Sequence, residues 1–304
     1  MTGAETVLYG GLRWHDDGSW HHRLIAADGT SRELPGRGHR LAFRLADERR
    51  WCLGYFTFED GAGSRQPCAT GAEATNGRQC ERCRKREGFS VVHHHRGALA
   101  ELPGQIREYI GRPHLLYIAC FGRGECKVGT APLTRRNTRL YEQGALLARF
   151  VASSPDGLHV RDSERLVSAA GFKESVTVRA KLAALSGALE DWPKLERTLA
   201  TAAAQAVDHL PPGTTVLSEP WTGGERFHRR LREYGRFLDV APRPDGAGEY
   251  VLDAVDAHGH VLLCRAADDS PELVLVDESP FVGRRIVLDD SIENRPAAAQ
   301  MGLF

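Results

Sequence analysis

The sequence lacks an apolar run of about 18 residues, the length that a membrane-spanning helix needs. Its start, MTGAETVLYGGLRWHDDGSW, also lacks the basic stretch followed by an apolar stretch that marks a signal peptide. We therefore expect a cytoplasmic protein with no membrane partner. The chain has no excess charge of either sign, because 40 Lys and Arg residues balance 40 Asp and Glu residues. Any argument for nucleic acid must therefore come from local patches of charge.

No internal repeat of 20 to 50 residues is visible, so a solenoid or propeller is not indicated. The chain has 304 residues, of which 41% are hydrophobic and 26% charged. This mixture is typical of a folded globular protein and not of a disordered one. The length favours about two domains with an additional module. Composition alone does not indicate an oligomeric state.

A disulfide framework is not expected either, because the number of cysteines is odd, seven in all, and the expected compartment is reducing. Cys120, Cys126 and Cys264 are scattered through apolar segments. A free cysteine behaves as a small buried hydrophobic residue. We therefore expect these three thiols to be reduced and packed in a core.

The pattern along the chain alternates between β-rich and helical segments. Short apolar runs broken by Asp-Gly and Pro-Gly turns predict a small antiparallel sheet or partial barrel at the start, and similar runs in 214–290 predict a small β-barrel at the end. From residue 114, the pattern predicts strand, strand, helix, strand and helix, and further helices follow. The expected fold class is α+β, divided into an N-terminal β-rich part, a zinc-binding loop region, a central α/β module with a helical extension, and a C-terminal barrel, at 1–50, 51–112, 113–210 and 211–304.

Four cysteines lie between residues 52 and 83, in a segment that is otherwise rich in glycine and polar residues. Cys80 and Cys83 have the Cys-x2-Cys spacing with which a tight turn presents two thiolates to one tetrahedral zinc ion. Cys68 and Cys52 complete the set, and a histidine is the alternative to Cys52. Four thiolates fill the coordination shell, so we expect a structural zinc that organises a loop without a core of its own. A reduced, metal-free cluster is the alternative.

Basic residues flank the Cys80–Cys83 pair. Arg82, Arg84 and Lys85 are candidates for binding the phosphates of nucleic acid. The alternative is a solvent-exposed surface on which Glu81 and Glu87 balance their charge. A run of three histidines follows at 93–95. His93 and His95 would face the same side of a strand and could share a metal ion, but an exposed basic stretch is the more ordinary interpretation.

The segment 114–172 resembles the GIY-YIG nuclease module, in the variant whose second motif reads Lys-Val/Ile-Gly. The matching residues are Leu115-Leu116-Tyr117 in the first motif, Lys127-Val128-Gly129 in the second, the helix from Arg135 to Glu142, and Glu164 on the next helix. The sequences KVGT and TRLYEQGA, together with the upstream cysteines, are also similar to a prokaryotic family known only as a domain of unknown function. That second resemblance covers about residues 50 to 185.

The resemblance to the nuclease module implies cleavage of a phosphodiester by a tyrosine-assisted water, an arginine and one glutamate-bound divalent ion. It implies Tyr117 as the first-motif tyrosine, Arg139 as the helix arginine and Glu164 as the ligand of Mg²⁺ or Mn²⁺. Arg135 and Arg136 are alternatives to Arg139 and candidates for binding nucleic acid. Such roles agree with the positive charge that a phosphoryl transition state needs at its equatorial oxygens.

Two residues depart from the pattern of the nuclease module. Lys127 stands where the second tyrosine is usual, and Leu115 stands in place of the first-motif glycine. Lys127 can bind phosphate or act as a base when it is desolvated, or its presence can mean that binding was kept and catalysis lost. Three functions therefore stay open, namely a DNA or RNA phosphodiesterase, a non-catalytic nucleic-acid-binding protein, and an enzyme that uses the same cleft for a small substrate.

Overall fold

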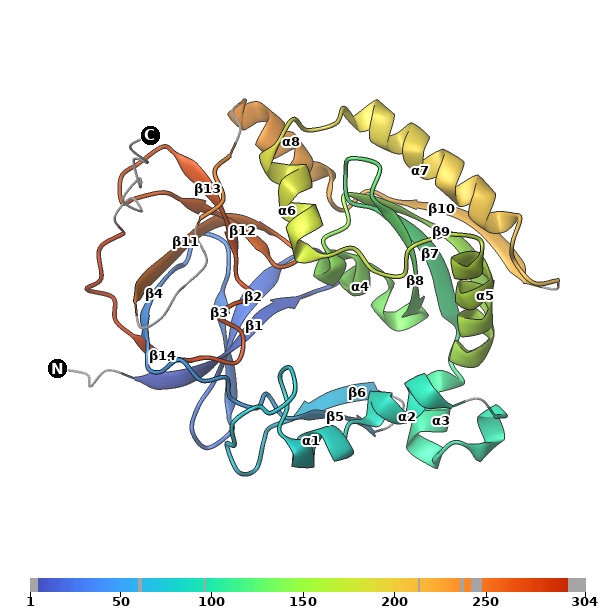
Figure 1. The fold of residues 1–304 in the computed structure, drawn as a ribbon, viewed down its shortest axis with the longest axis horizontal. Coiled ribbons are helices and arrows are strands. Elements are labelled where there is room, and N and C mark those ends of the chain that lie inside the picture. The colour runs from blue at the N-terminus through green and yellow to red at the C-terminus, as the bar shows by residue number, and fades with distance from the viewer. Residues whose placement is uncertain are drawn as a thin grey trace, which may run out of the picture.

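The structure is a computed structural model that describes residues 5–59, 62–95, 97–212, 214–235, 238–241 and 248–294. This part of the chain forms two antiparallel sheets and a smaller lobe (Figure 1). The larger sheet has eight strands in the described residues, in the order β13-β12-β11-β4-β14-β1-β2-β3. Its strands are β1 (Thr6–Trp14), β2 (Trp20–Ile25), β3 (Ser31–Pro35), β4 (Arg40–Leu45), β11 (Glu249–His258), β12 (Val261–Arg265), β13 (Leu273–Asp277) and β14 (Arg285–Leu288).

The large sheet combines strands from both ends of the chain, and the C-terminal strand β14 lies between the N-terminal strands β4 and β1. Val287 of β14 pairs with Thr6 of β1 on one side and with Arg44 of β4 on the other. The expectation of a closed C-terminal barrel is therefore wrong, since across the described residues the sheet is open and has β13 and β3 at its edges. The apolar pattern of a strand reveals which face is buried but not which strand lies beside it, so the pairing was not visible in the sequence.

The large sheet shares a core with the rest of the molecule through β12. Val261 and Leu263 belong to the core that includes the helices α6 (Val178–Ser186) and α8 (Glu225–Tyr234). Leu262 and Cys264, which point to the other face, belong to a second core, which is formed mainly by side chains of the large sheet itself. Because β12 is buried on both faces, the N-terminal and C-terminal strands and the central module are packed against one another.

The second sheet is the central one, with the order β10-β9-β7-β8 in the described residues. The three strands expected from residue 114 onward are present, and a fourth joins them from the C-terminal region. The strands are β7 (His114–Cys120), β8 (Cys126–Pro132), β9 (Leu147–Ser154) and β10 (Thr215–Trp221). The mixture of helices and antiparallel sheets agrees with the expected α+β class.

Helices cover both faces of the central sheet. On one face, Leu116 and Ile118 of β7 pack with apolar residues of α5 (Gly157–Ala169) and α7 (Trp192–Val207). On the other face, Leu115 and Tyr117 pack with Leu140 of α4 (Arg136–Gln143), which follows the short helix η2 (Leu133–Arg135). Alternate residues of one apolar strand thus contact different helices.

The helix that carries Glu164 begins earlier than the sequence indicates. The polar residues Asp162 and Ser163 ahead of an apolar run suggest an N-cap there. In the structure α5 begins at Gly157, and the Asp156 side chain accepts hydrogen bonds from the amides of Leu158 (2.9 Å) and His159 (2.8 Å). Glu164 therefore lies in the middle of the helix. The favourable interaction of a carboxylate with the positive N-terminal end of a helix is confined to the first turn, so it does not explain the presence of a glutamate at position 164.

Cys120 and Cys126 form a disulfide across the β7–β8 hairpin, which corrects the expectation that both are reduced. They are directly opposite each other in the ladder, and the Phe121 amide donates to the Glu125 carbonyl at 2.8 Å in the connecting turn. The tight hairpin places the two sulfurs side by side. Cys264 is a free, buried thiol, as expected.

The smaller lobe lies below the two sheets in Figure 1 and carries the cysteine cluster. The segment 52–88, in which the sequence shows little regular pattern, contains a hairpin and a short helix. The elements of the lobe are β5 (Tyr55–Glu59), β6 (Ala62–Gln66), α1 (Glu81–Lys85), α2 (Gly88–His94), η1 (Leu99–Glu101) and α3 (Gly104–Ile110). None of the described helices, in the lobe or elsewhere, is both long and apolar enough to cross a membrane.

Candidate functional site

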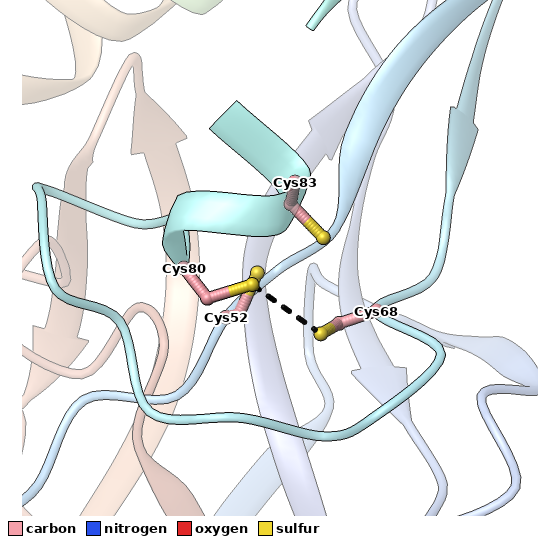
Figure 2. Close-up of side chains that lie close together, drawn as sticks. All are labelled: Cys52, Cys68, Cys80 and Cys83. Carbon is pink, nitrogen blue, oxygen red and sulfur yellow. Dashed lines mark hydrogen bonds between the residues drawn. The ribbon is translucent and has the colours of Figure 1, made fainter. Parts of the chain in front are cut away.

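The four cysteines of the lobe converge on one point, and their side chains point toward one another (Figure 2). Their sulfur atoms all lie within 4.8 Å of one another, and Cys68 Sγ lies 3.9 Å from Cys80 Sγ. Sulfurs that share a tetrahedral zinc ion are separated by about 3.8 Å, as a Zn–S bond of about 2.3 Å requires. The cluster can therefore hold a metal ion, and Cys52, the least regular ligand in sequence, lies within it.

Local backbone structure positions these ligands. Cys80 is the N-cap residue of α1 and Cys83 lies in its first turn, so that both thiols leave the same end of a short helix. The Cys52 amide donates to the Ala72 carbonyl at 2.9 Å, which holds the first ligand against the loop that leads to the Cys80–Cys83 pair. Cys52, Cys80 and Cys83 are almost fully buried, and Cys68 is partly exposed.

The acidity of the thiols differs within the cluster. Burial raises the pKa of Cys52 and that of Cys83. Burial acts in the same direction on Cys68, but hydrogen bonds at Thr70 and Ala72 outweigh it and lower the Cys68 pKa to about 6. A bound cation is what would make all four thiolates compatible in so small a volume. The donor set therefore suits a soft-ligand metal such as zinc.

A second group of polar residues gathers on the α4 side of the central sheet. It is built on the β7–β8 hairpin, where Tyr117 is opposite Gly129 and Ala119 is opposite Lys127. The ring of Tyr117 crosses β8 over Gly129, because a side chain at that glycine would place its Cβ 2.5 Å from the tyrosine hydroxyl. The glycine of the second motif therefore makes room for the tyrosine of the first motif.

Tyr117 is fully buried, and its hydroxyl makes no hydrogen bond of full geometry with the described residues, although the Arg139 guanidinium lies close to it. Burial raises the pKa of Tyr117 to about 12, and the neighbouring Arg139 guanidinium acts in the opposite direction. A buried hydroxyl without a partner costs free energy. Such an arrangement is typical of a site whose partner is a ligand or a water molecule.

Lys127 is almost as buried as Tyr117, at 6% exposure. Its ammonium group lies 6.0 Å from the centre of the Tyr117 ring and donates to the Glu174 carbonyl at 3.2 Å. Burial and, to a smaller extent, the Arg139 charge lower the pKa of Lys127 to about 8, while the Glu164 carboxylate opposes both effects. Near neutral pH this lysine is therefore closer to losing its proton than an exposed lysine is.

Arg139 and Glu164 reach this group from two helices. Arg139 comes from α4, is 41% exposed, and has Glu142 as an ion-pair partner at 3.8 Å. Glu164 comes from α5; burial raises its pKa, and Lys127 is the largest of the positive charges that oppose the rise. The structure therefore brings together all four residues that the sequence nominated as catalytic, namely Tyr117, Lys127, Arg139 and Glu164.

The sequence analysis missed a fifth member, Lys181 of α6. Its ammonium group donates to the Gln143 carbonyl at 2.6 Å and lies 4.6 Å from the centre of the Phe121 ring. Burial lowers the pKa of Lys181 to about 8, and repulsion from Lys127 adds to the effect. A lone lysine inside the apolar helical run VRAKLAALS was the only sequence signal for it.

The remaining basic candidates are held by ion pairs or lie on the lobe, and Arg135 shares the Glu142 carboxylate with Arg139. Arg135 pairs with Glu142 at 2.5 Å. Arg136 pairs with Glu219 at 2.6 Å and stacks on Phe150. Arg82, Arg84 and Lys85 lie on α1 beside the cysteine cluster and are exposed, with Lys85 paired to Glu81 at 2.9 Å.

The run of histidines does not form the strand on which a shared metal ion depended. Residues 88–94 form the helix α2, and His95 follows it with its Nε2 3.0 Å from the Ala98 carbonyl. The side chains of His93 and His94 lie outside the described part of the structure. The alternation of a strand, on which that pairing of His93 and His95 was based, is therefore absent from the backbone of 88–94.

In comparisons with known proteins, no family model, no curated protein and no solved structure matches this chain. The resemblance to the GIY-YIG module therefore depends on the residues themselves and on their arrangement.

Proposed function

We propose that this chain is a zinc-stabilised, divalent-metal-dependent phosphodiesterase that acts on nucleic acid. The observation that carries the proposal is the convergence of Tyr117, Lys127, Arg139 and Glu164, which come from four different elements. The first and last of these residues are 47 positions apart in the chain. All four interact within one partly buried group of charges. Titratable groups with shifted pKa values cluster preferentially at functional sites.

In this proposal the four thiolates of the lobe hold a zinc ion whose role is structural. The set is complete with sulfur ligands alone, so no coordination position is left for a substrate. The zinc would hold α1, with its exposed Arg82 and Arg84, in a fixed place on the lobe surface. We infer from this that the lobe contributes to binding and not to the chemical step.

The chemistry of phosphodiester cleavage suits the residues of the second group. Arg139 is half exposed and can bind a phosphate from the solvent side, and Lys127 supplies a second positive charge from within. The Tyr117 hydroxyl, which lacks a partner among the described residues, would donate to or accept from the attacking water. Alternatively Lys127, whose pKa is lowered to about 8, can remove a proton in its neutral form, in which case Arg139 supplies the positive charge without it.

A divalent ion fits Glu164. Burial and the nearby Glu174 carboxylate raise the pKa of Glu164, and a bound cation would relieve both effects. Mg²⁺ commonly needs only one or two protein carboxylates, with water and substrate phosphate as its other ligands. When bound there, Mg²⁺ or Mn²⁺ would supply positive charge to the transferring phosphoryl group.

A cleavage assay on DNA and RNA substrates with Mg²⁺ and Mn²⁺ tests this proposal. We expect Glu164→Gln to abolish cleavage while the binding of substrate survives. Asp162→Asn is the matched control, because Asp162 lies on the same helix, is 65% exposed and pairs only with Arg165 among the described residues. Wild-type protein that cleaves none of a broad panel of single-stranded, double-stranded and branched substrates would contradict the proposal.

A non-catalytic nucleic-acid-binding protein is the second candidate, and the full burial of Tyr117 is the observation that favours it. In that case, binding without cleavage should weaken steeply with salt, because phosphate contacts release counterions. Arg82→Ala together with Arg84→Ala should reduce the salt slope by about 2, near 1 for each lost phosphate contact. Binding that is absent at low salt would leave neither nucleic-acid function standing and would favour an enzyme acting on a small substrate.

A further inference from the structure

Outside both groups described above, two histidines and a glutamate meet on the exposed side of the large sheet. His15 Nε2 lies 3.0 Å from His21 Nδ1 and 3.7 Å from Glu33 Oε2. The three residues can each offer a ligand atom such that all three atoms lie within 4.8 Å of one another. Neither the cysteine cluster nor the group around Tyr117 includes any of them.

The pairing of β1, β2 and β3 explains why these side chains meet. His21 of β2 is opposite Pro35 of β3, so Glu33, two residues earlier, is a diagonal neighbour on the same face. The buried residues Trp20 and His22 alternate with His21, which places His21 on the solvent side of β2. His15 directly follows the end of β1, and its ring turns back over this face to make an edge contact with His21.

Neighbouring groups orient the Glu33 carboxylate and hold the turn that carries His15. The guanidinium of Arg13, directly opposite His21 on β1, contacts Glu33 Oε1 at 2.5 Å and leaves Oε2 directed at His15. The His15 amide donates to the Ser19 carbonyl at 2.9 Å, which closes the turn between β1 and β2. Ligand carboxylates in metal sites are usually oriented by a hydrogen-bonded partner of this kind.

The turn that carries His15 is itself held against the central module. The Asp16 carboxylate accepts from the Thr138 amide at 3.3 Å and from the Asn137 side chain at 3.3 Å, both in the first turn of α4. Trp14, on the other side of His15, stacks on Tyr141 of the same helix with ring centres 5.5 Å apart. The cluster therefore rests on rigid elements on both sides, and it does not lie on a free loop.

We propose that His15, His21 and Glu33 form a second metal site, which takes a divalent first-row transition ion of the zinc type. Two imidazoles and one carboxylate are donors that zinc accepts at about 2.0–2.2 Å, which places ligand atoms of a tetrahedral site roughly 3.3 Å apart. The separations of 3.0 and 3.7 Å lie on either side of that value. Three protein ligands leave a coordination position for water or an external ligand, so this site differs in kind from the closed four-cysteine cluster.

A direct hydrogen bond between the two imidazoles is the other explanation of the 3.0 Å contact. That explanation needs one ring to donate and the other to accept, and it leaves Glu33 Oε2 with only a long 3.7 Å contact to His15 Nε2. A metal ion would use all three atoms together. The two explanations differ in whether the protein binds a further equivalent of metal.

The test uses the full chain without an affinity tag, purified with the cysteine cluster filled with zinc and then dialysed to remove loose metal. Co²⁺ and Zn²⁺ are titrated into it by calorimetry and absorption spectroscopy. We expect one further equivalent to bind, and bound Co²⁺ to show visible d–d absorption without thiolate charge-transfer bands. Those bands would mean that the cobalt had entered the cysteine cluster, which would count against the proposal.

Variants locate the additional ion. His21→Ala and, separately, Glu33→Gln should each lower the affinity for this ion. The loss should exceed the roughly 10–100-fold that removal of an outer hydrogen-bond partner costs. His159→Ala is the control, because His159 is 71% exposed and remote from this cluster in the sheet. Glu33→Gln has nearly the same shape as the wild type, so it keeps the test meaningful if His21→Ala folds poorly. A wild type that binds no further equivalent, or a Glu33→Gln variant with unchanged affinity, overturns the proposal.

Discussion

At the scale of single residues, the central sheet contains an unusual pair of buried polar groups. Tyr117 and Lys127 are both almost inaccessible, and they lie on the same face of a hairpin next to two residues of opposite charge, Arg139 and Glu164. Apolar packing alone would favour phenylalanine and methionine at these positions. Polar residues at these two positions should therefore lower the free energy of unfolding, and this cost can be measured.

We expect Tyr117→Phe to leave the free energy of unfolding unchanged or to raise it by about 1 kcal/mol, because the lost hydroxyl has no hydrogen-bond partner among the described residues. The same change should abolish cleavage if the proposed chemistry is correct. Urea denaturation and the cleavage assay measure the two effects separately. A loss of several kcal/mol would instead show that the hydroxyl has a structural partner.

The buried lysines predict a dependence of stability on pH. Burial lowers the pKa of Lys127 from 10.5 to about 8, and Lys181 is affected in the same way. Between these two pH values the unfolded chain holds more protons than the folded chain, so stability should rise as pH increases from about 8 and should level off above about 10.5. Lys127→Met should flatten this rise, which urea midpoints at several pH values would reveal. Lys85→Met, at an exposed position, is the control, and an equal rise in both variants would contradict the assignment to Lys127.

At the scale of elements, the lobe has two unequal halves. The half that contains β5, α2 and α3 has its own apolar cluster, including Phe58, Ile106 and Tyr109. The half that contains α1 is held mainly by the cysteines, since among the hydrophobic side chains of the described residues only Tyr55 and Ala72 pack with them. Removal of the metal should therefore destabilise the half that contains α1 much more than the half that contains β5, α2 and α3.

We expect a chelator under reducing conditions to speed hydrogen exchange in residues 67–85, while the amides of β7 and β9 stay protected. Without the ion, four close thiols replace the bonds that held α1 to the loop around Cys52 and Cys68. Cys83→Ser should show the same loss in metal-containing buffer, whereas Cys264→Ala, outside the cluster, should keep its zinc. Unchanged exchange in 67–85 after complete metal removal would refute a structural role.

At the scale of the whole molecule, the two ends of the chain depend on each other. β14 separates β1 from β4, and β11 pairs with β4 on its other side. β4 therefore lacks both of its neighbours, and β1 lacks one of its two, until residues 249–288 have been made. This arrangement has high contact order, so folding of the large sheet should be late and slow.

A fragment that ends at residue 210 should consequently fail to form the large sheet, although it includes every N-terminal strand. We expect it to aggregate or to lose the near-ultraviolet dichroism of the full chain, because β1 and β4 would expose unpaired edges. Co-expression of the segment 211–304 should restore soluble protein. A fragment 1–210 that unfolds cooperatively, with protected amides in β1 and β4, would show that the N-terminal region is independent after all.

Much of the local structure was predictable from the sequence because local chemistry determines it. Cys80 and Cys83 indicated a metal-binding turn through their spacing, and the apolar run 114–120 indicated β7. A glycine after the helical run TRLYEQ is typical of a C-cap, and Gly144 does end α4 in the left-handed conformation, with φ of 66°. The resemblance to the nuclease module named Tyr117, Lys127, Arg139 and Glu164, and the structure places these residues together.

Other features required the tertiary structure, because they depend on which segments become neighbours. The sequence suggested a separate barrel for 211–304, whereas hydrogen bonding puts β14 between β1 and β4. The Cys120–Cys126 bond follows from the register of one hairpin, and Lys181 reaches the central group only because α6 packs beside it. His15, His21 and Glu33 have no spacing that marks a metal site.

The sequence by itself therefore determined the identities of the reactive side chains and the local elements that carry them. The tertiary structure decided which of these side chains lie near one another, because strand register and helix packing set the distances between residues that are far apart in the chain. This division is clearest for the cysteines. The spacing of Cys80 and Cys83 indicated their shared role, whereas Cys52 was named with a histidine as the alternative, and only the tertiary structure places its sulfur beside the other three.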